Sequence, residues 1–147
     1  MVQQAQQWIL PASINVNMKD GSEEQVLDSL IELAEKTHAV TDRKQLWADV
    51  REREVTASTA IDEEIILPHA KSEGVSSFCA AIGIARHKKI YLLTAWKETT
   101  HQELKKIAAL IEIFKEQENK RVALNAQDSM EVFELLQKKL KKYGIAI

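Results

Sequence analysis

Cysteine, glycine, proline and aromatic residues are all scarce in this chain of 147 residues, which has one cysteine, four glycines, two prolines and 5% aromatics. A single cysteine excludes an internal disulfide and indicates a reducing compartment. Cys79 lies in an apolar run, so we expect a buried, unreactive thiol. No apolar run approaches the length that crosses a bilayer, and the first residues lack the features of a secretory signal. We therefore expect a cytoplasmic protein without direct membrane insertion.

Charge and motif content exclude several classes of function. The net charge of −2 gives no electrostatic argument for a nucleic-acid partner. One basic cluster is expected to be a solvated helix end; it comprises Lys138, Lys139, Lys141 and Lys142. The four histidines form no short ligand pair, so we expect neither a metal nor a cofactor. No G-x-S-x-G elbow is present, which disfavours a hydrolase.

The length and the 45% hydrophobic content predict one domain over residues 1–147 with a substantial core. The predicted strands lie within 9–17 and at 65–67, 77–85 and 90–96. The last two are apolar at consecutive positions, which indicates burial on both faces. Helices are predicted after Ser22 and Asp42, at about 102–117, around 121–126, and at 130–142. The second of them should carry Arg53 near its C-terminal end, and Asp128 should start the last. This order predicts a layered α/β domain with a mixed β-sheet flanked by helices.

The most informative segment runs from Arg53 to Ala70. A short apolar run ends in Pro68-His69-Ala70, and Arg53-Glu54 and Ser58-Thr59 lie upstream of it. Proline fixes φ and has no N–H to donate, so a strand is predicted to end there. His69 is thus expected at a strand end, where an imidazole can act as nucleophile, base or metal ligand.

This order of residues resembles the signature of the type-2 EIIA domain of the bacterial phosphoenolpyruvate:sugar phosphotransferase system, the fructose/mannitol/nitrogen branch. That signature reads R-E, then S-T, then an aliphatic strand that ends in P-H. Further resemblance lies in residues 26–50, 98–114 and 129–140, so nearly the whole chain is covered. The resemblance implies an EIIA type-2-like fold and a phosphotransferase that forms a phosphohistidine.

The resemblance also implies roles for particular residues. In the family, phospho-HPr gives a phosphoryl group to the EIIA histidine, which passes it to an EIIB component during sugar uptake. Mapped by motif, His69 is the acceptor, Arg53 stabilises charge and His101 assists. Ser58 and Thr59 would contact phosphoryl oxygens or hold a local turn, and both roles stay open. The family reaches the membrane component EIIC through EIIB, and the oligomeric state is left open.

Structural alternatives stand beside these roles. Arg53 could pair with a neighbouring glutamate, and His101 could simply contact backbone at a helix start. Arg51 is the competing arginine, but its spacing to Pro-His does not fit the signature. His38 is expected at a helix C-terminus and His87 in an exposed loop, neither with a chemical role.

The alternative function is a regulatory EIIA-like binding module, whose phosphorylation state controls partner proteins rather than transport. Two departures from the family pattern bear on it. Ala60, Asp62 and Glu64 stand where the family often has glycines, which predicts added negative charge near the site. The segment 86–89 between two strands is also shorter than the family's.

Overall fold

The computed structural model describes residues 7–56, 60–85 and 89–147, with only the backbone of residues 55 and 56. Its elements are η1 (Pro11–Ser13), β1 (Ile14–Met18), α1 (Glu23–Ala34), η2 (Glu35–Thr37), α2 (Arg43–Thr56), β2 (Ile65–Ile66), β3 (His69–Lys71), β4 (Cys79–Ala85), β5 (Lys89–Trp96), α3 (His101–Lys115), α4 (Gln117–Leu124) and α5 (Ser129–Lys141). The predicted elements lie close to these bounds, so the local sequence signals were sufficient for most of them.

The described strands form a mixed five-stranded sheet in the order β1-β4-β5-β2, with β3 also paired to β5. β4 and β5 are antiparallel, from Cys79 opposite Ala95 to Ala85 opposite Lys89. β1 runs parallel to β4, and both β2 and β3 run parallel to β5. The predicted mixed α/β class is confirmed.

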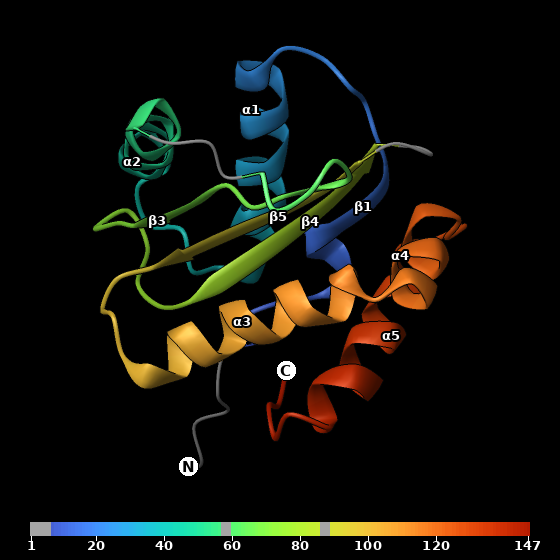
Figure 1. Ribbon diagram of the computed structural model, residues 1–147. Helices are drawn as coiled ribbons and strands as arrows, with labels where there is room; N and C mark the ends of the chain where they lie inside the picture. Colours follow the sequence, from blue (N-terminus) through green and yellow to red (C-terminus); the bar gives the residue numbers. More distant parts are fainter. Residues whose placement is uncertain (1–6, 57–59, 86–88) are drawn as a thin grey trace.

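Helices cover both faces of this sheet. Figure 1 shows α1 and α2 on one face and α3, α4 and α5 on the other. Every residue of β4 is buried, as the consecutive apolar positions predicted. Successive side chains of a strand point to opposite faces, so alternate residues of β4 and β5 supply two separate cores. Within the described ranges, every helix is too short or too polar to span a bilayer.

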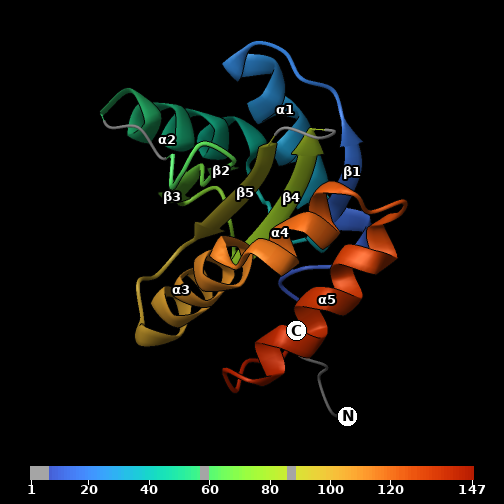
Figure 2. The same ribbon diagram turned by 45° about the vertical axis from the view of Figure 1, so that its right-hand side comes forward.

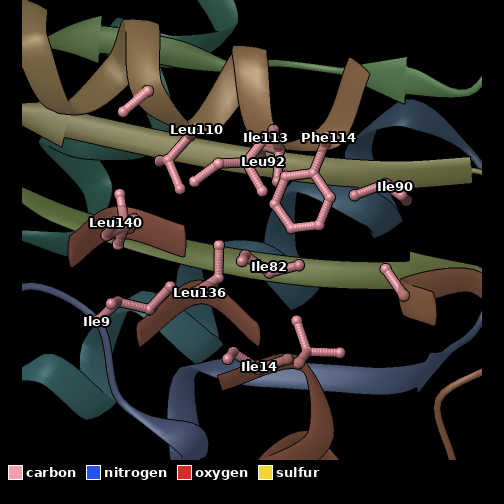
Figure 3. Close-up of a cluster of buried hydrophobic side chains, with 14 of the residues drawn as sticks. Ile9, Ile14, Ile82, Ile90, Leu92, Leu110, Ile113, Phe114, Leu136 and Leu140 are labelled. Carbon is pink, nitrogen blue, oxygen red and sulfur yellow. The ribbon is translucent and has the colours of Figure 1, made fainter. Parts of the chain in front are cut away.

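The larger core lies between the sheet and the α3–α5 layer. Figure 3 shows its side chains from the sheet and from the facing helices. Those labelled there are Ile9, Ile14, Ile82, Ile90, Leu92, Leu110, Ile113, Phe114, Leu136 and Leu140. The second core packs α1 and α2 on the opposite face of the sheet. The two helical layers therefore hold β5 rigidly from both sides.

Capping residues set the helix starts that position the rest of the chain. Ser22 Oγ accepts a hydrogen bond from the N–H of Gln25 (3.2 Å), and Asp128 Oδ1 accepts one from the N–H of Glu131 (3.1 Å). Such bonds satisfy N–H groups that have no partner within the helix. Both caps were predicted from the sequence and are confirmed.

The prediction that a strand ends at the proline is confirmed, but the sequence did not predict a second strand after it. The strand predicted over 65–67 ends at Ile66, and His69 is the first residue of a new strand. Both short strands pair with β5 and lie beside it in Figure 2. Pro68 lacks an N–H, yet its carbonyl still accepts a hydrogen bond from the N–H of Thr94 (3.0 Å). The chain therefore stays on the sheet through the proline.

Cys79 begins β4 and is buried. Burial raises the pKa of its thiol to about 12, against a smaller opposing effect of a hydrogen bond with Thr37. A thiol with that pKa stays protonated at neutral pH and is a poor nucleophile. The prediction of a buried cysteine is confirmed.

Candidate functional site

His69 is half-buried and makes one defined hydrogen bond through its ring. Its Nδ1 lies 2.8 Å from the carbonyl oxygen of Leu67. A carbonyl oxygen can only accept, so Nδ1 carries the hydrogen and donates it. The neutral ring is thereby held in one tautomer, and Nε2 keeps an unprotonated lone pair. The arrangement can supply a nucleophilic nitrogen or a base.

The ring of His69 also stacks on an indole. The His69 and Trp96 ring centroids lie 6.1 Å apart with 9° between the planes. The strand register places His69 directly opposite Thr94, whose buried hydroxyl has no hydrogen-bond partner among the described residues. Sequence reasoning missed both neighbours, because only the pairing of β3 with β5 brings them to the histidine.

Arg53 lies in the last turn of α2, as predicted. It lines a shallow groove of about 280 Å³ with Asp49, Glu52, Ala70 and Lys71. Arg53 forms none of the salt bridges found in the described part of the chain. The alternative in which Arg53 pairs with a neighbouring glutamate is therefore not observed among these residues.

Arg51 behaves differently from Arg53. Its guanidinium pairs with Glu23 (3.3 Å) and Glu24 (3.6 Å) of α1. Two arginines on one helical segment thus have different surroundings: Arg51 pairs with acidic side chains of α1, and Arg53 lines a groove shared with β3. Arg51 is therefore a matched control for any test of Arg53.

Two residues of β3, Ala70 and Lys71, line the groove of Arg53. Ala70 belongs to the core under α1 and α2, whereas His69 stacks on Trp96, which belongs to the core under α3–α5. Because neighbouring strand residues point to opposite faces, Ala70 points to the face opposite His69 and Lys71 to the same face. Among the described residues, no hydrogen bond or salt bridge joins the side chains of Arg53 and His69.

His101 is the first residue of α3 rather than a residue before it, and it is exposed. Thr100 caps the helix: its hydroxyl accepts from the N–H of Gln102 (3.3 Å) and also contacts the Glu103 carboxylate. The preceding residue, Thr99, accepts a hydrogen bond from Trp96 Nε1 (3.0 Å). Trp96 thus contacts His69 on one side and the segment that leads to His101 on the other.

Several candidates lie elsewhere. Ser58, Thr59 and His87 lie outside the described residues, so their predicted roles stay predictions. His38 is exposed and ends the η2 turn that follows α1, with a left-handed φ of 66°. Within the part of the chain that the structure describes, no three histidine, cysteine or acidic side chains gather in a way that could hold a metal.

Asp62 and Glu64 share one lysine, which offsets one of their two negative charges. Lys120 of α4 places its ammonium 3.2 Å from Asp62 Oδ2 and 3.4 Å from Glu64 Oε1, and its side chain is only 5% exposed. Asp62 Oδ1 also accepts from the N–H groups of Glu64 (2.7 Å) and Ile65 (2.9 Å). We call Lys120, Asp62 and Glu64 the α4 clamp; it fixes the segment that enters β2.

The α4 clamp favours its charged forms. Burial raises the pKa of Asp62, but hydrogen bonds from Glu64, Lys120 and Ile65 outweigh this effect and hold that pKa below its ordinary value of 3.8. Burial likewise lowers the pKa of Lys120, and its bonds to the two carboxylates outweigh that effect and raise it above 10.5. Asp62 and Lys120 are therefore charged together over the whole neutral range.

A Lys120→Met variant is expected to lose about 1–3 kcal/mol of unfolding free energy at neutral pH. Methionine keeps the apolar stem but leaves two carboxylates without a cation; the loss is at the low end for a buried pair because both carboxylates are partly solvated. Urea unfolding measures it, with Lys115→Met, an exposed lysine, as the control. An equal loss in both variants would contradict the role of the α4 clamp.

The same comparison has a defined pH dependence. A carboxylate with a lowered native pKa stabilises the fold above its ordinary pKa, and that stabilisation disappears as the pH falls through the native pKa. A lysine with a raised native pKa stabilises below its ordinary pKa, and loses this as the pH rises through the native value. The difference between wild type and Lys120→Met should therefore be constant from about pH 5 to 10 and shrink outside that range.

The fold and the site define a class of protein: a small α/β domain that presents one histidine, in a fixed tautomer, on a strand of a mixed sheet. Residues 9–139 match the family described as phosphoenolpyruvate-dependent sugar phosphotransferase system, EIIA 2. The chain belongs to this family, and the resemblance predicted from its motifs is confirmed.

The chain is also similar in sequence to a known phosphotransferase-system protein and in structure to several others. The chain is 21% identical over 136 residues, 84% of its length, to the PTS system fructose-specific EIIABC component of Bacillus subtilis (strain 168), and it spans only 21% of that relative's length. The nitrogen regulatory protein IIA-Ntr from Neisseria meningitidis superposes with a TM-score of 0.76 at 16% identity, covering 88% of this chain and 96% of that one. Enzyme IIAMtl from Escherichia coli, in complex with phosphorylated enzyme IIBMtl, gives 0.66 at 17% identity, with 85% and 94% covered. At these identities the superpositions establish the fold.

Proposed function

We propose that this chain is a phosphocarrier that accepts a phosphoryl group from phospho-HPr on Nε2 of His69 and passes it to an EIIB component. The observation that carries the proposal is the hydrogen bond from Nδ1 to Leu67, which leaves Nε2 as the free nucleophile. In the first transfer the Nε2–P bond forms as the bond from phosphorus to the donor's histidine breaks, and the donor ring recovers its lone pair. In the second transfer the Nε2–P bond breaks as a bond from phosphorus to the EIIB acceptor forms, and His69 recovers its lone pair.

The remaining site residues would act on charge and orientation. Phosphoryl transfer passes through a loose transition state, so catalysis is mainly positioning and charge stabilisation. Arg53 offers a planar guanidinium at the sheet edge beside β3, and such a fork matches phosphoryl oxygens. His101, exposed at the start of α3, would donate an N–H to the transferred group. Their approach to His69 would be completed when a partner and the phosphoryl group are bound.

The proposed partners follow from the family and from its relatives. A structural neighbour, enzyme IIAMtl, is found in complex with phosphorylated enzyme IIBMtl, which supports an EIIB protein or domain as acceptor here. The family description supports phosphoenolpyruvate as the original source of the group. HPr is proposed as the immediate donor, as the resemblance of the motifs implies. The relay would take place in the cytoplasm, and a membrane EIIC component would be reached through EIIB.

The proposal is tested by intact-mass spectrometry after incubation with phosphoenolpyruvate, enzyme I and HPr. The sample is kept alkaline because phosphohistidine is labile in acid. We expect the mass of one phosphoryl group to be gained, to depend on HPr, and to be lost again when an EIIB protein is added.

No gain of mass by a folded sample would contradict the phosphocarrier role. It would favour the alternative, a regulatory binding module that works without the relay. A gain that EIIB cannot remove would instead contradict the second transfer and favour a module whose phosphorylation state is read by other proteins.

An Arg53→Gln variant is expected to take up the phosphoryl group about tenfold more slowly or worse, since it removes the cation that stabilises charge in transfer. Its unfolding free energy should stay within about 0.5 kcal/mol of wild type, because a half-buried arginine outside the observed salt bridges contributes little to stability. Arg51→Gln is the matched control and should transfer at the wild-type rate. Equal slowing in both variants would exclude a specific role for Arg53.

A further inference from the structure

Among the described residues, one hydrogen bond restrains the ring of His69. The bond from Nδ1 to Leu67 restrains χ1 and χ2 through a single atom, and a hydrogen bond tolerates a spread of angles, so the direction of Nε2 keeps some freedom. Transfer of a phosphoryl group requires the attacking nitrogen to line up with the phosphorus and the leaving group. A second contact would narrow the range of orientations of the imidazole plane.

Trp96 makes that second contact. The two rings are parallel to within 9°, and their 6.1 Å centroid separation is that of an offset stack. β3 pairs with β5 in parallel register, with His69 opposite Thr94 and Lys71 opposite Trp96. Thr94 and Trp96 therefore lie on the same face of β5 as the histidine ring.

The indole is itself held in place. Trp96 is 8% exposed and belongs to the core under α3–α5. Its Nε1–H donates to Thr99 Oγ1 (3.0 Å), and its carbonyl accepts from the N–H of Ser72 (2.8 Å). A side chain fixed by burial and by a hydrogen bond at its far end is a rigid surface for another ring.

We infer that Trp96 is a positioning residue: its indole fixes the plane of the His69 imidazole so that Nε2 is presented in one direction for phosphoryl transfer. The inference rests on the function proposed above. Trp96 takes no part in the bond changes; it acts through His69. The same stack makes the histidine ring sensitive to the indole, which gives a direct spectroscopic test.

The first measurement is NMR of the His69 ring. The carbon-bound ring protons facing the indole should be shifted upfield by its ring current in wild type. The shift should persist in Trp96→Phe, which keeps a flat aromatic face, and disappear in Trp96→Leu, which keeps an apolar side chain without one. An unshifted ring in wild type would overturn the inference, whatever the protein does with phosphoryl groups.

The second measurement compares phosphorylation rates with two donors, phospho-HPr and phosphoramidate. Phosphoramidate makes the same bond change: the Nε2–P bond forms, the donor's P–N bond breaks, and the nitrogen leaves as ammonia with a proton from water. Trp96→Leu should slow labelling about tenfold with both donors, because misdirecting Nε2 affects any donor. Trp96→Phe should restore the rate to within about threefold of wild type.

Thr99→Val extends the test without touching either ring. It removes only the acceptor of the Trp96 N–H, so a small slowing with both donors and a reduced ring-current shift are expected. If Trp96→Leu does not fold, Trp96→Phe and Thr99→Val test the positioning role instead. The readouts are again the ring-current shift of the His69 protons and the labelling rates with the two donors. Slowing with phospho-HPr alone would show that Trp96 belongs to a docking surface and would overturn the positioning role.

Failure of the two proposals is distinguishable. A wild-type chain that is labelled by neither donor contradicts the phosphocarrier function, while the ring-current shift still reports whether the indole holds the imidazole. A labelled chain in which Trp96→Leu reacts at the wild-type rate leaves the phosphocarrier function intact and overturns the role of Trp96.

Discussion

A His69→Ala variant is expected to take up no phosphoryl group under conditions that label the wild-type chain completely. The methyl group leaves no ring nitrogen at this place, and a residue that forms the covalent intermediate cannot be bypassed. Intact-mass spectrometry at alkaline pH measures the loss. Because the His69 side chain is half-buried on a short strand, circular dichroism should still show a folded protein.

Two further variants make this test specific. His69→Asn keeps an N–H group near the position of Nδ1, able to donate to Leu67, but has no Nε2; it should also stay unlabelled. His38→Asn is the matched control and should be labelled like wild type. Asparagine is chosen there because His38 has a φ of 66°, which asparagine tolerates better than alanine. Equal labelling of His69→Ala and wild type would move the acceptor elsewhere, with His101 the first position to examine.

A Gly74→Ala variant is expected to lose about 3 kcal/mol of unfolding free energy. A Cβ atom at this buried glycine would lie 2.6 Å from the carbonyl oxygen of Asp42 and 2.7 Å from the backbone nitrogen of Leu46. Both atoms belong to the backbone at the start of α2, which cannot move aside as a side chain can. The Gly74 carbonyl also accepts from the N–H groups of Thr41 (2.8 Å) and Asp42 (3.0 Å), so the clash would displace the segment that seats α2.

Gly21→Ala provides the comparison for Gly74→Ala in urea unfolding. Its Cβ would lie 2.5 Å from Gln25 Oε1, the far end of a flexible side chain that can rotate away. The loss there should be below about 1 kcal/mol, mainly from the weakened cap of α1. Equal losses in the two variants would show that the backbone contacts of Gly74 do not govern stability. Because α2 also carries Arg53, a destabilised but folded Gly74→Ala protein should transfer phosphoryl groups more slowly.

The elements of the fold were predictable where the sequence signal is local. Consecutive apolar residues predicted strands buried on both faces, and Ser22 and Asp128 predicted helix starts, because caps and periodicity depend on near neighbours. The strand that begins at His69 was missed, because the rule about proline concerns its missing donor and not its carbonyl. Pairing with β5 uses that carbonyl.

The surroundings of the site were less predictable, because they depend on contacts across the fold. Lys120 and Asp62 are 58 residues apart in sequence, and nothing local to either one indicates the pair. Acidic residues in place of glycines predicted added negative charge, and the lysine from α4 that offsets one of the two charges was not indicated by the sequence. The stack of His69 on Trp96 likewise depends on strand register, which one sequence does not reveal.

The interrupted strand that holds His69 also bears on strand pairing between molecules at the edge of the sheet. Among the described strands, β3 pairs with β5 alone, so it lies at an edge of the sheet, where unpaired backbone groups can recruit a strand from another molecule. If His69 meets partner proteins, as proposed above, it cannot be covered permanently. Here the edge consists of two very short strands separated by Leu67 and Pro68, and the proline offers no N–H to an incoming strand. The same segment therefore leaves the histidine accessible and makes the edge a poor template for aggregation.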